Sequence, residues 1–171
     1  MTSRIRWPGE GVVVGLIAYA AVAAFYALFD QLAARGPLYT LNLLGQTAFR
    51  SLRDPSVLQG PIALDPPAML WYNALHLVLS LAIGLVVTGL VVHAERRPNR
   101  GRLVALTIIA GFLITILVVG RLTDPMRALL PWWSIVVANS LAVVLAGWFL
   151  LRRHQGLLRR LMGGGAGEWH R

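Results

Sequence analysis

Apolar residues dominate four stretches of the chain, and each stretch is long enough to cross a membrane as a helix. A hydrocarbon core of ~30 Å takes ~20 helical residues. The four runs cover residues 11–34, 68–93, 103–121 and 128–151, with charged residues, prolines and glycines between them. The pattern predicts an all-α integral membrane four-helix bundle, with a single four-span transmembrane domain over residues 1–160.

The segment between the first two spans, about residues 38–58, is too apolar for a plain linker. Its apolar residues recur at helical spacing: Leu41, Leu44, Ala48 and Leu52. A polar face is available from Asn42, Gln46, Arg50 and Arg53. We therefore expect a short amphipathic helix that lies on the outer membrane surface or caps the bundle. A lid over the helix ends is favoured over a docking surface for a partner.

Composition supports lipid as the solvent of this chain. Hydrophobic residues make up 57% of the sequence and charged residues 13%, against about 25% charged in soluble domains. There is no cysteine, which excludes thiol redox chemistry and thiolate metal ligation by this chain. All 16 basic residues are arginine, a bias that fits a GC-rich bacterial coding sequence.

The arginines also predict the orientation in the membrane. Eleven lie in the two ends of the chain and in the connection between spans two and three, and five lie in the other two connections. By the positive-inside rule both termini should be cytoplasmic, in a bacterial cytoplasmic (inner) membrane. Arg4 and Arg6 followed by an apolar run resemble the start of a secretory signal peptide. The apolar run is longer than the ~7–15 residues of a signal-peptide core, which favours an uncleaved membrane anchor. Because membrane orientation accounts for the basic excess, no nucleic-acid partner is expected.

Small and polar residues form stripes on the predicted spans. On span two Asn73, His76, Ser80, Gly84 and Thr88 fall within about 120° of arc at ~100° per residue. Further ridges are Gly11 and Gly15 on span one, Thr107, Gly111 and Thr115 on span three, and Ser134, Ala138, Ala142 and Ala146 on span four. Such ridges let membrane helices approach closely, so these positions are predicted to pack helix on helix.

A polar cluster is predicted at the outer ends of the spans. Trp71 and Tyr72 suit an interfacial aromatic belt, which places His76 only ~6–8 Å deeper at 1.5 Å per residue. The ends of the other spans should gather at the same level. The candidate ligand-binding residues are Asp30, Tyr72, Asn73, His76, Arg121, Trp132, Trp133 and Asn139.

His76 has several interpretations, and helix packing is favoured because a shallow neutral imidazole is easily satisfied. A quinone, a lipid or another amphipathic small molecule is the next alternative, since polar groups beside aromatic rings suit such ligands. Haem or metal ligation needs further ligands, and no other histidine can face His76 across the bundle. A small oligomeric transporter is a further alternative. No metal site and no cofactor are predicted.

The acidic residues and the search for motifs give no catalytic residue. Asp54, Asp65 and Asp124 each precede a proline and are predicted to cap helices. No phosphate loop, nucleophile elbow or zinc-protease motif is present. Residues 161–171 read as a flexible cytoplasmic tail. The sequence thus predicts a small, non-enzymatic structural or accessory subunit, whose partners are the lipid bilayer and other membrane subunits or further copies of itself.

Overall fold

The computed structural model describes residues 6–50 and 62–154, and within these ranges the chain is helical with no strand. The five α-helices are α1 (Arg6–Leu32), α2 (Tyr39–Phe49), α3 (Pro66–Arg96), α4 (Gly101–Leu122) and α5 (Trp132–Arg153). The short 3₁₀ turns Pro98–Arg100 and Asp124–Met126 precede α4 and α5. The predicted residues 51–58 of the outer segment and the tail 161–171 lie outside the described ranges.

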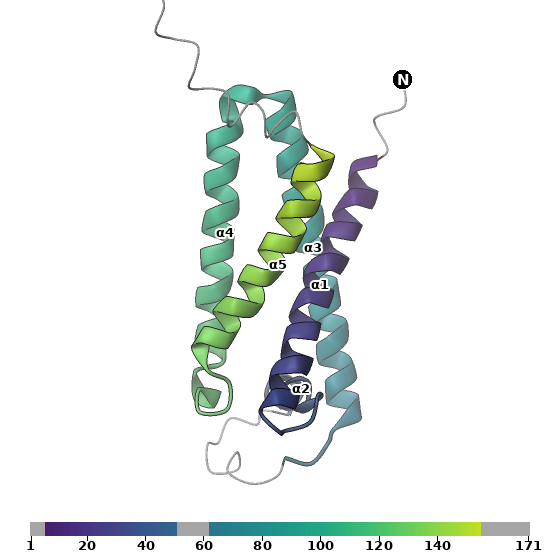
Figure 1. The fold of residues 1–171 in the computed structure, drawn as a ribbon, viewed down its shortest axis with the longest axis vertical. Coiled ribbons are helices and arrows are strands. Elements are labelled where there is room, and N and C mark those ends of the chain that lie inside the picture. The colour runs from purple at the N-terminus through teal and green to yellow at the C-terminus, as the bar shows by residue number, and fades with distance from the viewer. Residues whose placement is uncertain (1–5, 51–61, 155–171) are drawn as a thin grey trace, which may run out of the picture.

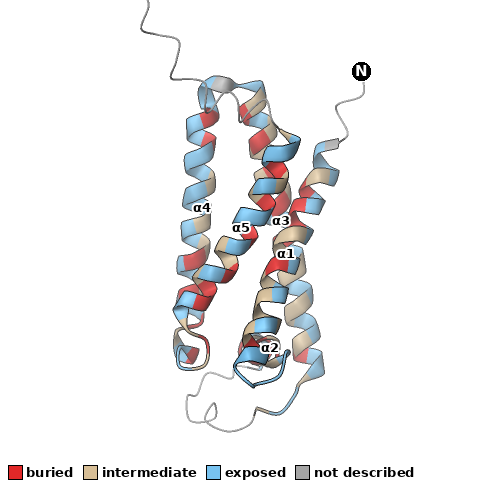
Figure 2. Cartoon of the chain, viewed as in Figure 1, coloured by how far each residue is buried: buried red, intermediate tan, exposed pale blue. Residues whose placement is uncertain are grey.

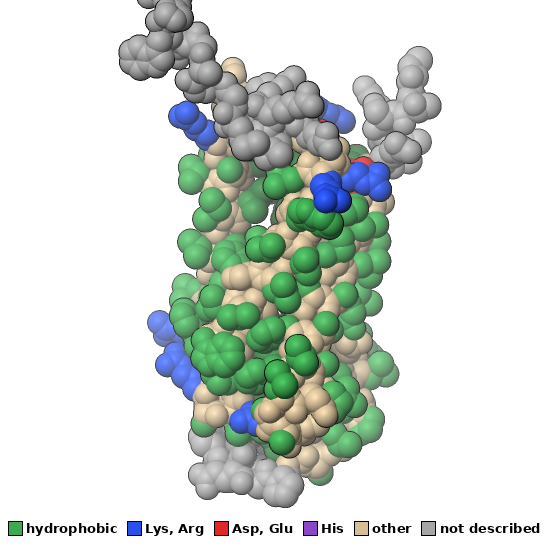
Figure 3. All heavy atoms as spheres, in the orientation of Figure 1, with side chains coloured by type: hydrophobic (Ala, Val, Ile, Leu, Met, Phe, Trp, Pro, Cys, Tyr) green, Lys and Arg blue, Asp and Glu red, His purple; other side chains and the backbone are tan. Residues whose placement is uncertain are grey.

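Four of the helices, α1, α3, α4 and α5, are long and apolar enough to cross a membrane. The start of α1, the end of α5 and the turn between α3 and α4 lie at one end of the molecule, which we name the terminal end (Figure 1). The opposite end, which holds α2 and the turn between α4 and α5, is named the α2 end (Figure 1). Hydrophobic side chains cover the visible surface between the two ends, while arginines gather close to them (Figure 3).

The helix ends differ from the predicted span limits. α3 extends from Pro66 to Arg96, beyond both ends of the predicted apolar span 68–93. The helix continues past the apolar residues because its backbone groups bond to one another. The fourth span begins at Trp132 and not at residue 128. Pro131 is extended, with φ −61° and ψ 139°, and proline disfavours a helical conformation in the residue before it. The chain therefore turns once more before α5 begins.

The buried face of α2 is not the predicted apolar one. Leu43 is fully buried, but Thr40 and Asn42 beside it are almost fully buried as well, whereas Ala48 is exposed. Asn42 Nδ2 donates to the Ala63 carbonyl at 3.1 Å, and Asn42 Oδ1 accepts from the backbone N–H of Asp65 at 3.0 Å. Burial of these polar groups is tolerated because they are hydrogen-bonded. The predicted polar face of α2 thus packs against the start of α3 and bonds to the backbone that precedes it.

Burial is unevenly distributed between the helices (Figure 2). α1 makes its most extensive contacts with α3 and then with α5. One apolar cluster joins Val14 of α1, Val91 of α3, and Ala146 and Leu150 of α5. The buried residues of α4 lie only near its two ends: Gly101, Val104, Ile116 and Gly120. The middle of α4 therefore has much less protein around it than the middle of α3.

Candidate functional site at the α2 end

The polar part of the candidate site consists of side chains from α1 and α3. The Tyr19 hydroxyl donates to Asn73 Oδ1 at 2.7 Å. The His76 ring lies one turn further along α3, with its centroid 5.2 Å from the Tyr19 ring and 6.3 Å from the Tyr72 ring. All four side chains are half-buried. Three of the predicted ligand-binding residues, Tyr72, Asn73 and His76, are therefore neighbours, and Tyr19 joins them.

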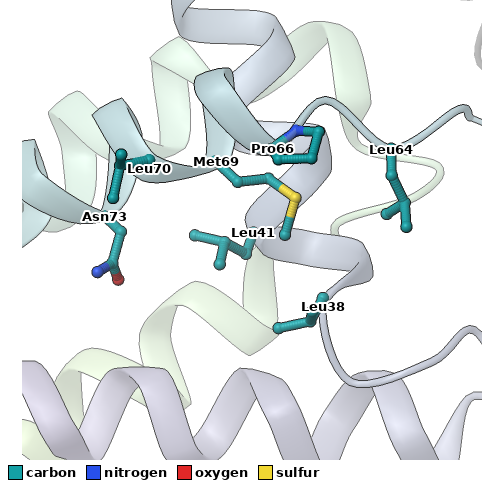
Figure 4. Close-up of a pocket in the computed structure, with 7 residues that line it drawn as sticks. All are labelled: Leu38, Leu41, Leu64, Pro66, Met69, Leu70 and Asn73. Atoms are coloured by element: carbon teal, nitrogen blue, oxygen red, sulfur yellow. The ribbon is translucent and has the colours of Figure 1, made fainter.

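A groove opens beside this polar group, between the start of α2 and the start of α3 (Figure 4). Its volume is about 380 Å³. Six apolar residues line it, with Asn73 at its inner end: Leu38, Leu41, Leu64, Pro66, Met69 and Leu70. The arrangement offers an apolar wall and one amide, which are the chemical features of a site for an amphipathic molecule.

Asp30 does not join His76, because both of its carboxylate oxygens contact α2. Oδ2 accepts from the backbone N–H of Thr40 at 2.7 Å, and Oδ1 accepts from the Thr40 hydroxyl at 2.7 Å. Asp30 is fully buried. The N-cap residue of α2, Leu38, provides no side-chain hydrogen bond, so Asp30 satisfies a free N–H of the first turn in its place. The contacts of Asp30 thus belong to α2, and its place in a ligand cluster stays a prediction.

The predicted members from α5 also have other partners. Trp133 meets the Phe29 ring edge to face at 5.6 Å, and Asn139 Nδ2 donates to the Ile135 carbonyl of its own helix at 2.8 Å. The indole of Trp132 lies against Gly120, where any β-carbon would collide with it. Glycine at this position lets the end of α4 meet the start of α5.

Arg121 is exposed and has no hydrogen-bond or ion-pair partner in the described part of the chain. The single outer cluster predicted from the sequence is therefore divided into separate contacts. One group contains Tyr19, Tyr72, Asn73 and His76. Asn139 bonds within α5, and the remaining candidates serve helix ends or face outward.

The small residues of α1 and α3 lie against each other at the closest approach of these helices. A β-carbon on Gly84 would meet the Gly11 carbonyl and the Gly15 backbone nitrogen. One on Gly15 would lie 2.6 Å from the Leu81 α-carbon and 2.7 Å from the Ser80 carbonyl. Real β-carbons essentially never come this close. Only glycine fits at these positions, as in other membrane helices whose backbones pack directly.

The remaining packing candidates divide into two sets. Thr88 is fully buried on α3, and Ala138, Ala142 and Ala146 form the buried stripe of α5. Gly111 is different, because it is exposed and a β-carbon built on it has no neighbour within 4 Å. The small ridge of α4 therefore does not face another described helix of this chain, and helix packing at Gly111 stays a prediction.

Sequence reasoning missed a contact between three helices at the terminal end. His154, just after α5, places Nδ1 3.0 Å from Glu95 Oε1 of α3 and Nε2 3.3 Å from Glu10 Oε2 of α1. The helix order brings these distant residues to one end, and no local spacing signals it. Since the carboxylates approach opposite nitrogens of the ring, the three groups do not converge on one ion. The described residues hold no set of three or more side chains able to bind a metal.

Outside the spans, Asp65 links the end of α2 to the start of α3. Its carboxylate lies 2.7 Å from Arg50 Nε and accepts from the Ala68 backbone N–H at 3.0 Å, so it caps α3 as predicted. The Arg50 hydrogen bond, with that of Ala68, holds the pKa of Asp65 below its ordinary value of 3.8. Burial raises the pKa of Tyr39.

Asp124 behaves differently from Asp65. It pairs with Arg127 three residues later, and its side chain makes no capping hydrogen bond. The ion pair takes the place of the predicted cap. Only a three-residue 3₁₀ turn, and no α-helix, begins at Asp124, so there is no row of free N–H groups for its carboxylate to cap. Asp54, the third predicted cap, lies outside the described residues.

The fold and these contacts define a helical protein with four apolar helices of membrane-spanning length, which indicates a membrane location. Comparison with protein-family models, curated proteins and solved structures finds no match for the chain.

Proposed function

We propose that this protein is a non-enzymatic structural or accessory subunit of a larger assembly in a bacterial cytoplasmic membrane. The observation that supports this proposal is the bare middle of α4. Between Val104 and Ile116 no residue of α4 is buried. Gly111 lies in the centre of this stretch with open space where its side chain would be.

The surface of α4 suits a partner helix as well as lipid. The Thr107 hydroxyl donates to the Leu103 carbonyl at 2.9 Å, and the Thr115 hydroxyl donates to the Gly111 carbonyl at 2.9 Å. Both hydroxyls are therefore satisfied within the helix and leave a smooth ridge of small residues. In lipid, such ridges favour close helix association through van der Waals contact. We propose that α4 packs against another membrane subunit at Gly111.

The proposed orientation has both termini on the cytoplasmic side. The support for it is the excess of arginines in the termini and in the connection between α3 and α4. Labelling of single cysteines from either side of the membrane tests this orientation. A cysteine at Asn99 should react only from the cytoplasmic side, and one at Gly36 only from outside.

Photo-cross-linking tests the subunit proposal directly. A photoreactive amino acid replaces Leu113 of α4, which is 59% exposed, and in a matched control replaces Leu16 of α1, which is 44% exposed. The proposal predicts a protein adduct of defined mass from position 113 and only lipid adducts from position 16. Lipid adducts alone from both positions would contradict it.

A second candidate function is the binding of an amphipathic small molecule, such as a quinone or a lipid, in the groove beside Asn73. The support is the apolar lining of the groove together with the amide, imidazole and phenol groups next to it. Absorption spectroscopy and organic extraction of the purified protein test this candidate. A stoichiometric extracted molecule whose amount falls in Asn73→Leu would support it, and an unchanged amount would contradict it.

A further inference from the structure

The arginines at the α2 end are mostly engaged by the protein itself. Arg50 Nε lies 2.7 Å from a carboxylate oxygen of Asp65, and Arg127 pairs with Asp124. Arg35 Nη1 donates at 2.8 Å to a backbone carbonyl in the connection between α4 and α5. Of the described arginines at this end, Arg121 alone is exposed without such a partner.

The arginines at the terminal end have no carboxylate partner in the described part of the chain. Six of them are exposed: Arg96, Arg97, Arg100, Arg102, Arg152 and Arg153. Two of these lie over aromatic rings of their own helix. The Arg152 guanidinium is 3.9 Å from the centre of the Trp148 ring, and that of Arg153 is 5.5 Å from the centre of the Phe149 ring. A ring contact orients a guanidinium but leaves its charge and its N–H donors available.

The two described acidic residues of this end are held by His154 instead. Glu10 and Glu95 contact opposite nitrogens of its ring. His154 is only 11% exposed in its side chain, while the arginines around it face outward. The arrangement occupies the carboxylates and leaves the guanidiniums free.

We propose that the arginines of the terminal end form a binding surface for the phosphate of anionic phospholipid headgroups. Guanidinium groups bind phosphate through paired, charge-assisted hydrogen bonds. The position of Trp148 favours a lipid over a soluble acidic partner. Its ring is 55% exposed at the end of an apolar span, where tryptophans lie at headgroup level, and Arg152 stacks on it. This inference requires only the membrane location, and not the subunit role proposed above.

His154 is a positioning residue for this surface. Without it, Glu10 and Glu95 would be left as carboxylates at the same end of the bundle as the arginines. They would then pair with guanidiniums or repel the lipid phosphate, and either effect weakens lipid binding. The effect should disappear when the carboxylates themselves are removed, because His154 does not contact the lipid.

Native mass spectrometry of the full chain in detergent tests the proposal, with phosphatidylglycerol and phosphatidylcholine of the same acyl chains as probes. We expect phosphatidylglycerol to bind at least fivefold more tightly. An arginine near an anionic surface contributes about a fivefold change in affinity, so Arg152→Gln and Arg97→Gln should each weaken phosphatidylglycerol binding by about that factor. Arg121→Gln is the matched control, because it removes an exposed, unpaired arginine at the other end, and it should leave binding unchanged.

A second set of variants tests the role of His154. His154→Gln should weaken phosphatidylglycerol binding severalfold, and the triple variant with Glu10→Gln and Glu95→Gln should restore it. Restoration separates a charge effect from damage to the fold, since the triple variant also lacks the three-helix contact. A triple variant that binds no better than His154→Gln would overturn the positioning role.

Three results would overturn the lipid proposal. The first is equal affinity for the two lipids, and the second is an equal loss from Arg121→Gln and Arg152→Gln. The third is that an oligonucleotide binds through Arg97 and Arg152 while the lipids show no difference, which would assign the surface to nucleic acid instead.

Discussion

α3 and α4 follow each other across a turn of four residues, and both carry a ridge of small residues, yet the two ridges have opposite surroundings. Their most apolar 18-residue stretches have similar mean hydropathies, 2.5 in α3 and 2.8 in α4. Gly84 of α3 lies directly against the backbone of α1, whereas Gly111 of α4 faces open space. A ridge of small residues therefore permits close helix approach, while the rest of the fold decides whether the partner helix is in the same chain.

The largest expected effect comes from closing the contact at Gly84. Gly84→Leu forces side-chain atoms into the backbone of Gly11 and Gly15, and we expect a loss of about 3 kcal/mol or more in the free energy of unfolding. Gly111→Leu is the matched control, and it should change stability by no more than about 0.5 kcal/mol. Thermal unfolding in detergent measures both. Equal losses of unfolding free energy in the two variants would show that Gly84 is no more tightly packed than Gly111.

The packed side of the molecule also depends on the buried carboxylate between α1 and α2. Asp30→Ala leaves the Thr40 N–H and hydroxyl without their acceptors in a fully buried site, and we expect a loss of about 2 kcal/mol. Asp30→Asn, which retains one acceptor oxygen, should lose less. Hydrogen exchange of the α2 amides reports the change locally. Unchanged exchange in Asp30→Ala would show that α2 does not depend on this contact.

Smaller effects are expected around His76. Tyr19→Phe removes the hydrogen bond to Asn73, which should cost about 1 kcal/mol. His76→Gln removes only ring contacts with Tyr19 and Tyr72, so the protein should remain folded and lose less than Tyr19→Phe. The measurement is again thermal unfolding. A folded His76→Gln protein that loses a bound molecule would favour the ligand-binding alternative.

The smallest effect concerns the exposed pair of Arg50 and Asp65. Because the pKa of Asp65 is lowered in the folded protein, the pair stabilises the fold at pH values above the ordinary pKa of an aspartate. This contribution is lost as the pH falls through the lowered pKa. In Arg50→Gln the acid-side loss of stability should therefore be smaller than in the wild type. Melting curves between pH 2 and 7 measure it, and parallel curves for the two proteins would argue against the pair.

The sequence predicts much of this fold because the strongest constraints on a membrane protein act along the chain. Span length and apolar composition set α1, α3 and α4 to within a few residues, and Asp65 before two prolines sets the start of α3. α5 begins at Trp132, four residues after the predicted start at 128, because Pro131 is extended. The apolar pattern runs through Pro131 and gave no sign of this.

The candidate site was harder to predict, because helical phase shows which residues share a face but not which face a neighbour covers. Asn73 and His76 lie one turn apart, since both belong to α3. The partner of Asp30 could not be predicted, because Thr40 lies on a short helix whose buried face is polar. The contact of His154 with Glu10 and Glu95 depends on three chain segments meeting at one end, which no local pattern records.

The mass of the assembly in mild detergent shows whether α4 packs on another membrane subunit at Gly111, as we propose. The wild-type protein, extracted from its native membrane, should run with a second chain in a fixed ratio. Gly111→Leu should release the protein as a folded monomer with an unchanged melting temperature. A monomeric wild type, or an assembly that Gly111→Leu leaves intact, would contradict packing of another subunit on α4.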